Sequence, residues 1–475
     1  MHMIHSSKFE LSLRFAFTVY LVSVADSGVE DSSGKEGNRC TGKRHEHIYG
    51  LHEQYNSNVV RIGPNELSFR DASLIGPMMG THGLSKGPGF DGLTAYSEIR
   101  ALSAWRDSEM HALRRRAWVR GMGANALNEY EALLVRRVGQ VIEALLERKG
   151  AEVDIANFLK RFGFDFMNDM AFGGGPEYVQ NGDVQGTLVQ TEVALRAGMI
   201  PDTIPWVGHF VAGELRKEQL KAEVKAKARI ERGSTSPDLF HYLNHEDSHE
   251  EERPSLSIVA VEGLLVTVAG AGTAVAAVCC ALYFLLRYPE AYKKVQEEID
   301  KFYPQGEDAL NTRHFPDMVY LDAVVNETLR LYSAQMSGSQ RATDEHGIMA
   351  GSHYIPPYTS VRVHTYSVHR DPRNFSPSPS TFWPERWLIA ENPSDYKGSE
   401  PFIHNMNAYI PFSFGPANCV GKSLALKVVK MALCALLQRA NVKFAKGYDP
   451  EEWDRKIGDF VVLEVGRLPV VIGER

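Results

Sequence analysis

The residues that could most clearly do chemistry surround one cysteine, Cys419, near the end of the chain. It lies in the stretch Pro411-Phe412-Ser413-Phe414-Gly415-Pro416-Ala417-Asn418-Cys419-Val420-Gly421, where Phe412 and Gly415 precede it and Gly421 opens an apolar helix. A helix N-terminus brings N–H groups and a positive dipole to the sulfur, which favours the thiolate. Glycines let the backbone fold around a bulky flat ligand, and such a thiolate suits axial ligation of haem iron. These residues alone leave a second interpretation open, an inert buried cysteine.

Three further patterns carry charged or hydroxyl side chains at regular spacing. Glu327 and Arg330 are three residues apart, which places them on one face of a predicted helix. Arg386 lies in Phe382-Trp383-Pro384-Glu385-Arg386-Trp387, and Ala269-Gly270-Ala271-Gly272-Thr273 falls in the middle of another predicted helix. A lone Glu-x-x-Arg is common, and such a pair usually lies on the surface and contributes little to stability. Only the patterns taken together therefore indicate a function.

In this order and spacing the patterns resemble those of the cytochrome P450 family, the haem-thiolate monooxygenases. The resemblance runs from a strand predicted at Val59 to Leu468-Pro469-Val470, and it is strongest to fungal members that oxidise secondary metabolites. It implies the cytochrome P450 fold, mostly α with a minor β part, in a single large domain. It also implies that haem b, an iron protoporphyrin, is the cofactor, with an axial thiolate from Cys419.

The same resemblance implies a structural triad of Glu327, Arg330 and Arg386 that joins a helix to the loop before the cysteine. Buried charges of this kind are tolerated only when they satisfy one another. Thr273 is implied to be the catalytic residue that helps to deliver protons during oxygen activation.

The resemblance further implies a set of haem-binding residues. His111 and Arg115 are four residues apart on one helix, and Arg341 is placed to bind a propionate through its guanidinium fork. The full set that is implied to bind the cofactor is His111, Arg115, Arg341, Phe412, Gly415 and Gly421.

The sequence departs from the family's pattern at three positions. Gly272 replaces the usual acid before the threonine, and Ala274 replaces the usual second hydroxyl residue. Proton delivery must then use water, another side chain or the substrate. Ala417 replaces the usual basic residue two positions before the cysteine, which removes one propionate partner.

Composition excludes two other classes of protein. The 475 residues carry a net charge of −7, from 52 basic and 59 acidic residues, which argues against a nucleic-acid partner. Five cysteines are too few, and odd in number, for a disulfide scaffold. With 44% hydrophobic residues, the chain can build a large core.

The elements that position these residues are mostly helical. We predict a strand at Val59–Pro64, helices at Glu214–Arg232, Ser257–Arg287, Phe315–Leu331 and Gly421–Arg439, and a strand at Ser360–Tyr366. Ile200–Trp206 is predicted to be a turn with exposed apolar residues. The domain prediction is a signal or anchor remnant at 1–25, a polar linker at 26–47 and the monooxygenase domain at 48–475.

Two apolar runs could in principle insert into a membrane. Phe15–Ala25 is too short to span a bilayer and fits a signal-peptide core or the remnant of an anchor. Gly263–Leu286 has no charged residue and passes the length test, but a helix that is apolar on all sides also suits the centre of a soluble core. We predict a core helix.

A zinc hydrolase is the distant alternative. His245-Glu246-Asp247-Ser248-His249 matches the His-Glu-x-x-His pattern, in which two histidines on one helix face bind zinc. The stretch continues as Glu250-Glu251-Glu252-Arg253-Pro254 without an apolar face, so we interpret it as a solvated acidic loop.

The resemblance implies a monooxygenase that inserts one oxygen atom into an apolar small molecule such as a terpenoid or a polyketide. The substrate would contact Val266–Thr273, Ser337–Gln340 and Phe460–Leu463. Electrons would come from an NADPH-dependent cytochrome P450 reductase at the endoplasmic reticulum membrane surface. Because Gly272 lacks the acid, a haem-thiolate enzyme that uses peroxide or rearranges its substrate is the alternative.

Overall fold

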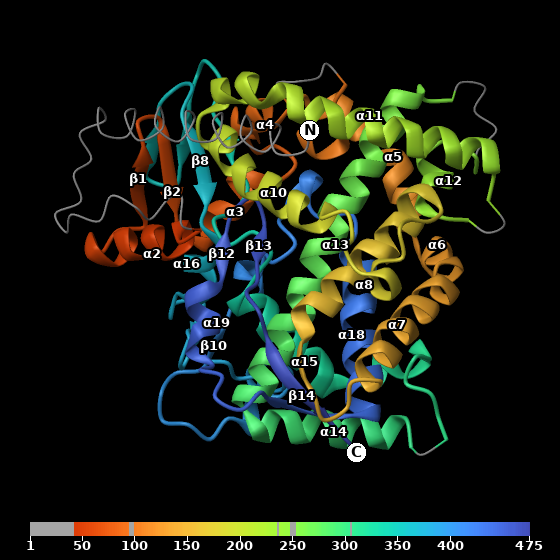
Figure 1. Cartoon of the computed structure of the whole chain (residues 1–475). Coiled ribbons are helices and arrows are strands. Elements are labelled where there is room, and N and C mark those ends of the chain that lie inside the picture. The colour runs from red at the N-terminus through yellow and green to blue at the C-terminus, as the bar shows by residue number, and fades with distance from the viewer. Residues whose placement is uncertain (1–41, 95–98, 235–236, 248–252, 305) are drawn as a thin grey trace.

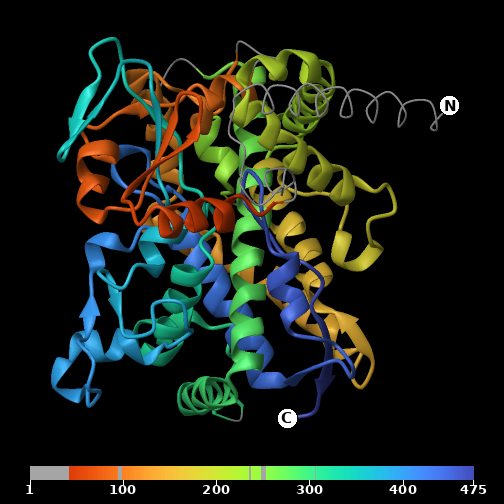
Figure 2. The same cartoon turned by 90° about the vertical axis from the view of Figure 1, so that its left-hand side faces the viewer.

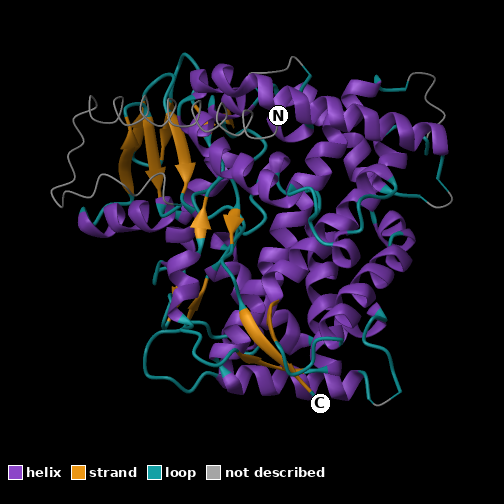
Figure 3. Ribbon diagram, viewed as in Figure 1, coloured by secondary structure: helices purple, strands orange, loops and turns teal. Residues whose placement is uncertain are grey.

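The computed structural model describes residues 42–475 apart from 95–98, 235–236, 248–252 and 305. Helices form most of it, and the strands gather along one side, which confirms the mostly α fold with a minor β part (Figure 3). In chain order the helices are α2 (Arg44–Gln54), α3 (Ile75–Met79), α4 (Gly89–Leu93), α5 (Ser108–Gly121), α6 (Ala124–Glu129), α7 (Glu131–Leu146), α8 (Ile155–Phe172), α9 (Tyr178–Asn181), α10 (Thr187–Thr203), α11 (Gly208–Arg232), α12 (Leu239–Leu243), α13 (Leu256–Arg287), α14 (Pro289–Phe302), α15 (Val319–Leu331), α16 (Thr365–Arg370), α17 (Glu385–Glu391), α18 (Lys422–Arg439) and α19 (Glu451–Lys456).

The strands form one five-stranded sheet and several smaller pairings. They are β1 (Val59–Gly63), β2 (Glu66–Phe69), β3 (Ser85–Lys86), β4 (Glu152–Asp154), β5 (Arg341–Ala342), β6 (Ile348–Ala350), β7 (His353–Ile355), β8 (Ser360–Val363), β9 (Phe375–Ser376), β10 (Ile403–His404), β11 (Asn441–Phe444), β12 (Gly458–Asp459), β13 (Leu463–Glu464) and β14 (Pro469–Gly473). The strand predicted at Val59 is β1, and the one predicted at Ser360 ends at Val363, where α16 soon begins.

The five-stranded sheet joins strands from residues 59–86 to strands from residues 341–363, beside the helices (Figure 1). Its order is β1-β2-β8-β5-β3, and only the β2–β8 pair is parallel among its neighbours. In the β3–β5 pair, Lys86 lies directly opposite Arg341. The sheet therefore places two basic side chains as cross-strand neighbours.

The long helix α13 runs through the centre of the molecule (Figure 2). Ser255 caps its N-terminus by accepting a hydrogen bond from Ile258 N–H, and Pro289 follows its last residue closely, as the sequence predicts. Every residue from Ala274 to Leu285 is buried, against α8, α15 and α18 among other elements. Within the described residues α13 is the one helix long and apolar enough to cross a membrane, and it forms the core instead.

Glycines let α8 and α13 approach closely. A Cβ atom at Gly163 of α8 would lie 2.6 Å from the Ala271 carbonyl oxygen of α13. A Cβ atom at Gly270 would lie 2.4 Å from Met167 Sδ. Real side chains cannot approach so closely, so helix packing accounts for glycine at both positions.

The turn predicted at Ile200–Trp206 is wrong. These residues form the last turn of α10, with Pro201 inside it, and the 3-10 turn η3 (Pro205–Val207). Ile200 is buried with Val207 in a small cluster, whereas Trp206 is 51% exposed, as predicted. Pro201 lies near the C-terminal end of α10, where it removes only one backbone hydrogen bond and packing compensates.

A buried network of charges joins the end of α10 to the sheet. Asp202 accepts hydrogen bonds from Arg362 Nη2 at 2.7 Å and from Arg44 Nη1 at 3.3 Å. Glu66 accepts from Arg362 Nε at 2.6 Å and from Gln340 Nε2 at 3.0 Å. Burial would raise the pKa of Glu66, but the charges of Arg362 and Arg44 outweigh it and lower that pKa to about 2.

This network corrects the boundary of the predicted linker. Residues 44–47 were assigned to the linker but begin α2, because Arg44 is buried in the ion pairs with Glu66 and Asp202. The predicted signal or anchor remnant at 1–25 lies outside the described residues.

Candidate functional site

The loop that carries Cys419 is folded by its own backbone. Cys419 N–H donates to the Phe412 carbonyl at 2.9 Å, and Asn418 N–H donates to the Gly415 carbonyl at 3.0 Å. Gly415 has a φ of 71°, and a Cβ atom there would lie 2.0 Å from the Met79 carbonyl oxygen of α3. Glycine is therefore required at 415 both by conformation and by space.

Cys419 differs from the other described cysteines. Cys279, Cys280 and Cys434 are buried in the core, whereas Cys419 is exposed. Burial by the surrounding loop and helices nevertheless raises the pKa of its thiol, while Gly421 N–H and the charges of Arg115 and Lys422 act in the opposite direction. The helix end alone therefore does not produce the predicted thiolate, and a coordinated metal cation would have to displace the proton.

Phe412 and Gly421 lie on either side of the cysteine. The Phe412 ring is partly buried, with the Lys422 ammonium 5.7 Å from its centroid. A Cβ atom at Gly421 would meet only Cys419 Sγ among the described atoms, at 3.9 Å. The protein itself therefore does not require glycine at 421, and the space beside the sulfur is open.

The predicted propionate residues converge near this loop. His111 and Arg115 lie on α5, and Arg115 donates to the Asn418 carbonyl at 2.8 Å and to Asn418 Oδ1 at 2.5 Å. Burial, followed by the charges of Lys86, Arg115 and Arg341, lowers the pKa of His111 to about 4. Arg341 is 3% exposed, and burial lowers its pKa to about 10.

Sequence reasoning missed Lys86, which belongs to the same cluster. It is 8% exposed, and burial followed by the charges of Arg341 and Arg115 lowers its pKa to about 7. Across the described part of the chain, none of Lys86, His111, Arg115 and Arg341 forms an ion pair with an Asp or Glu. Basic side chains that are largely buried and lack acidic partners indicate a site for an anionic ligand.

The centre of α13 contributes Thr273. Its hydroxyl donates to the Ala269 carbonyl at 2.7 Å, so the proton is engaged by the helix itself. A Cβ atom at Gly272 would have no described atom within 4 Å. The missing acid therefore leaves open space next to Thr273.

The structure brings Glu327, Arg330 and Arg386 together with no solvent exposure. Arg330 Nε and Nη2 donate to the two Glu327 oxygens, each at 2.8 Å, and Arg386 Nε donates to Glu327 Oε1 at 3.0 Å. Burial alone would raise the pKa of Glu327, but the two arginines outweigh it and lower that pKa. Two buried arginines thus share one carboxylate, and Arg386 Nη1 is left without a hydrogen-bond partner among the described residues.

Two tryptophans complete this cluster and were not predicted. Trp383 N–H and Trp387 Nε1–H each donate to Glu327 at 3.0 Å. The two arginines in turn donate to the carbonyls of Pro377, Ser378, Pro379 and Thr381. The spacing of Trp383 and Trp387 around Arg386 was visible in the sequence, but it did not identify Glu327 as their common acceptor.

Two of the three segments predicted to contact a substrate, Ser337–Gln340 and Phe460–Leu463, lie near each other. Ser337 donates to Asp459, and Leu463 N–H donates to the Ala334 carbonyl at 2.7 Å. Strand β13, which contains Leu463, packs against α13. Gln340 differs from the prediction in that both ends of its side chain are engaged, by Gly89 N–H at 2.8 Å and by Glu66.

The described part of the zinc motif, residues 245–247, forms a turn and not a helix. His245 has a φ of 53° and lies in a turn after α12, and Glu246 accepts hydrogen bonds from Asn244, His241 and Arg229. His249 lies outside the described residues. In the described part of the chain no group of three or more His, Cys, Asp or Glu side chains could hold a metal ion.

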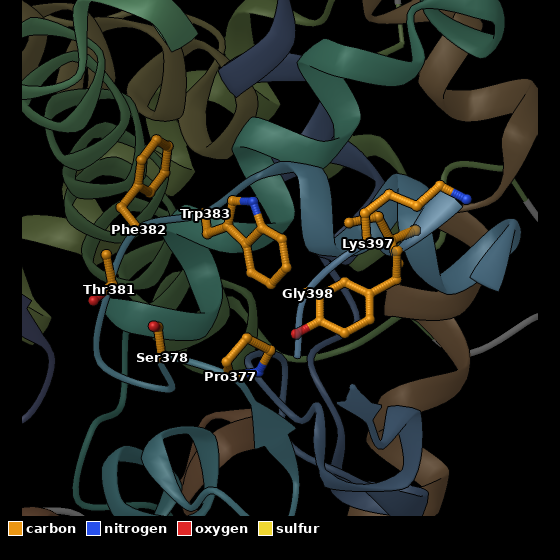
Figure 4. A pocket seen from close by; sticks show the side chains of 9 residues that line it. Pro377, Ser378, Thr381, Phe382, Trp383, Lys397 and Gly398 are labelled. Carbon is orange, nitrogen blue, oxygen red and sulfur yellow. The ribbon is translucent and has the colours of Figure 1, made fainter. Parts of the chain in front are cut away.

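A pocket of about 480 Å³ opens beside the triad segment (Figure 4). The rings of Phe382 and Trp383, together with Lys397, line it. None of the predicted site residues is among its lining residues. It is therefore separate from the cysteine site.

The comparisons with known proteins agree with one another. The cytochrome P450 family model matches residues 81–468. Cytochrome P450 monooxygenase phqL of Penicillium fellutanum is 30% identical over 441 residues, which cover 90% of this chain and 75% of the relative. Trichothecene C-15 hydroxylase of Fusarium sporotrichioides is 28% identical over 424 residues, covering 86% and 83%.

A solved structure, the cytochrome P450DA heme domain, superposes with a TM-score of 0.75. It is 18% identical, and the match covers 91% of this chain and 94% of that one. At this identity the likeness shows a shared fold.

Proposed function

Because this chain belongs to the cytochrome P450 family, whose members are haem-thiolate monooxygenases, we propose that Cys419 supplies the axial thiolate. The observation that carries the proposal is the exposed position of Cys419 beside Arg115, which belongs to a cluster of basic side chains without acidic partners in the described part of the chain. The cofactor of the family is iron protoporphyrin with a cysteine ligand, and its two propionates are anions of the kind that such a cluster binds.

The residues present fit haem in three respects. The sulfur is accessible, the cations lack acidic partners, and a Cβ atom at Gly272 or Gly421 would meet little or no protein. We assign propionate binding to His111, Arg115 and Arg341. Phe412 and Gly415 shape the loop under the cofactor, and Gly415 does so through its left-handed backbone.

When bound, haem with a thiolate ligand activates dioxygen so that one oxygen atom enters the substrate. The chain's own residues have to hold the cofactor, exclude water and move protons. Thr273 is the hydroxyl residue of α13 at the open space, and turning its O–H away from the Ala269 carbonyl would free the donor. Without an acid at Gly272, we assign the remaining proton transfer to water or to the substrate.

We propose an apolar small molecule of secondary metabolism, such as a terpenoid or a polyketide, as the substrate. The segments Val266–Thr273, Ser337–Gln340 and Phe460–Leu463 would surround it. The likeness to a trichothecene hydroxylase supports hydroxylation as the reaction. Apolar sites with few polar anchors suit such compounds.

For electrons we propose an NADPH-dependent cytochrome P450 reductase, at the surface of the endoplasmic reticulum membrane. Family membership supports a redox partner. The likeness to fungal P450 monooxygenases supports contact with that membrane surface.

A second candidate is a haem-thiolate enzyme that uses peroxide or rearranges its substrate without activating dioxygen. The observation in its favour is Gly272, which leaves α13 without the acid beside Thr273. Dependence of turnover on NADPH and reductase, compared with turnover driven by added hydrogen peroxide, separates the two.

The absorption spectrum of the reduced protein under carbon monoxide tests the proposal. A red-shifted thiolate band, with iron and no zinc in metal analysis, is the expected result. A protein without iron or without that band would contradict it. Spectral titration with candidate metabolites then identifies the substrate class.

The Gly421→Ala variant tests the space beside the sulfur. A Cβ atom at 421 meets only Cys419 Sγ at an ordinary contact distance, so the apoprotein should fold as well as the wild type. Haem loading should fall, because the methyl group enters the space assigned to the cofactor. Unchanged loading would show that this space is not the cofactor site. Gly50→Ala serves as the control, because Gly50 is exposed on α2 and a Cβ atom there would meet no described atom within 4 Å.

The Thr273→Val variant tests proton delivery. Valine keeps the shape and removes the hydroxyl, so haem content and substrate binding should change little. Product formed per NADPH consumed should fall, and hydrogen peroxide should account for the difference. Wild-type coupling in this variant would remove Thr273 from the proposed role.

The Gly272→Asp variant tests, in the same assay, whether an acid next to Thr273 improves coupling. The open space next to Thr273 can accept a side chain, so the added carboxylate should raise product per NADPH above the wild type. A lower ratio would mean that the substrate needs this space.

A further inference from the structure

We propose that Glu262 of α13 is a positioning residue that fixes α13 relative to the cysteine loop, which carries Cys419, through a chain of contacts that runs along α5. The inference rests on the proposed function, because it assumes that the cofactor lies between α13 and that loop. It assigns a role to a buried acid that none of the sequence patterns includes.

The carboxyl group of Glu262 holds two other segments against α13. Its Oε2 accepts hydrogen bonds from Trp118 Nε1–H of α5 at 3.0 Å and from Leu102 N–H at 3.1 Å. Leu102 begins the 3-10 turn η2 (Leu102–Ala104), which precedes α5 in the chain and packs against both α5 and α13. Glu262, Leu102 and Trp118 are each at most 5% exposed, so water cannot easily replace the acceptor if it is removed.

Packing alone does not explain an acid at this position. Glu262 Oε1 is buried and has no hydrogen-bond partner among the described residues. Burial is the main influence on this carboxyl group and raises its pKa to about 7, against the effects of the two N–H donors and of the charges of Arg114 and Lys86. An apolar side chain would avoid the cost of burying a polar group, so we attribute the acid to the two donors that it holds.

Helix α5 connects Trp118 to the cysteine loop. Arg115 lies three residues before Trp118, so the two side chains are neighbours on the helix surface. Arg115 donates to the Asn418 carbonyl at 2.8 Å and to Asn418 Oδ1 at 2.5 Å, and Asn418 immediately precedes Cys419. Contacts therefore lead from Glu262 through Trp118 and Arg115 to the loop.

Glu262 and Thr273 share one face of α13. They are 11 residues apart in the helix, which is about 20° more than three full turns and about 16 Å along the axis. A shift or rotation of α13 relative to α5 at Glu262 would therefore also displace Thr273 relative to the cysteine loop. The proposed proton delivery needs Thr273 at a fixed place above that loop.

The test compares Glu262→Leu with Glu262→Gln in the full-length holoenzyme. Leucine removes both acceptor oxygens, whereas glutamine keeps one carbonyl oxygen for the two donors. Glu298→Leu is the matched control. Glu298 of α14 also accepts hydrogen bonds from two N–H groups, those of Tyr320 at 2.8 Å and Leu321 at 2.7 Å, but it joins α14 to α15.

Two measurements report on the two ends of the chain of contacts. Residue-resolved hydrogen exchange of the Leu102 amide reports the contact with Glu262, and transfer of haem to excess apomyoglobin reports the cysteine side. For Glu262→Leu we expect about tenfold faster exchange at Leu102 and about tenfold faster haem loss, the effect of about one lost hydrogen bond. Glu262→Gln and Glu298→Leu should stay near the wild type in both.

The Trp118→Phe variant separates action through α5 from a local effect on η2. It removes only the indole donor, so haem loss should be faster while the Leu102 amide keeps its slow exchange. In the Glu262→Leu background, Trp118→Phe should add little to haem loss, because the shared acceptor is already gone. Additive effects of the two substitutions would show that Glu262 and Trp118 act independently and would overturn the inference.

Folding and the parent proposal are checked separately. If Glu262→Leu yields too little folded protein, Trp118→Phe, which leaves the acid in place, supports the haem-loss comparison with Glu298→Leu. A Glu262→Gln protein that loses haem faster than the wild type, although it keeps an acceptor, would contradict the inference. Absence of the thiolate band in the wild type would overturn the proposed function itself. A normal wild-type band with unchanged haem loss in Glu262→Leu and Trp118→Phe would overturn only this inference.

Discussion

The Cys419→Ala variant is expected to lose the red-shifted band of the reduced, carbon monoxide-bound protein and all turnover. The methyl group cannot act as an anionic ligand, and the other described cysteines are buried in the core, away from the loop. Because Cys419 is exposed and its neighbours make their own backbone hydrogen bonds, the fold should persist. Absorption spectra and the melting temperature measure both expectations.

The matched control is Cys434→Ala in α18. Cys434 is fully buried, and its thiol donates only a long contact to Met318 Sδ at 4.0 Å. This variant should keep the thiolate band while losing some stability through the cavity it creates. If Cys419→Ala keeps the band, the ligand assignment is wrong.

The second large effect is expected at the triad. Glu327→Ala leaves Arg330 and Arg386 buried without their shared acceptor, and it removes the acceptor of Trp383 and Trp387 as well. Uncompensated buried charges of this kind cost about 3–5 kcal/mol, a large part of the stability of a typical domain. We expect little soluble, haem-loaded protein.

Two comparisons make this expectation specific. Glu345→Ala, at an exposed carboxylate, should leave yield and melting temperature unchanged. Trp387→Phe removes one hydrogen bond and keeps the ion pairs, so it should cost only about 1–3 kcal/mol. A Glu327→Ala protein with normal yield, haem content and thermal unfolding would show that the cluster does not support the fold.

The sequence predicted those helices and strands whose pattern lies within one continuous segment. The absence of charge over Gly263–Leu286 and the proline at 289 located α13, and the β-branched run before the Gly-Pro turn located β1. Glu327 and Arg330 could be paired because helix geometry places residues three apart on one face. Arg386 could be joined to them only through the family resemblance.

The features that were missed depend on pairing between distant segments. Lys86 lies opposite Arg341 because β3 joins β5, and no local pattern encodes that register. The helical end of α10 depends on packing of Ile200 and Val207 and on the ion pairs of Asp202, which outweigh the local preference of Pro201 for a turn. The raised pKa of the Cys419 thiol likewise depends on burial by segments distant in sequence, which opposes the effect of the helix end.

The charge network of Asp202 restricts which segments of this chain can be exchanged with those of a relative in a chimeric protein. Asp202 contributes the acid at the end of α10, whereas Arg44, Glu66 and Arg362 come from α2, β2 and β8. A chimera that imports α10 from a relative without an acid at this place would bury two arginines with one carboxylate between them. Crossover points should therefore keep α10 with the sheet of the same parent, or carry the aspartate along with the new helix.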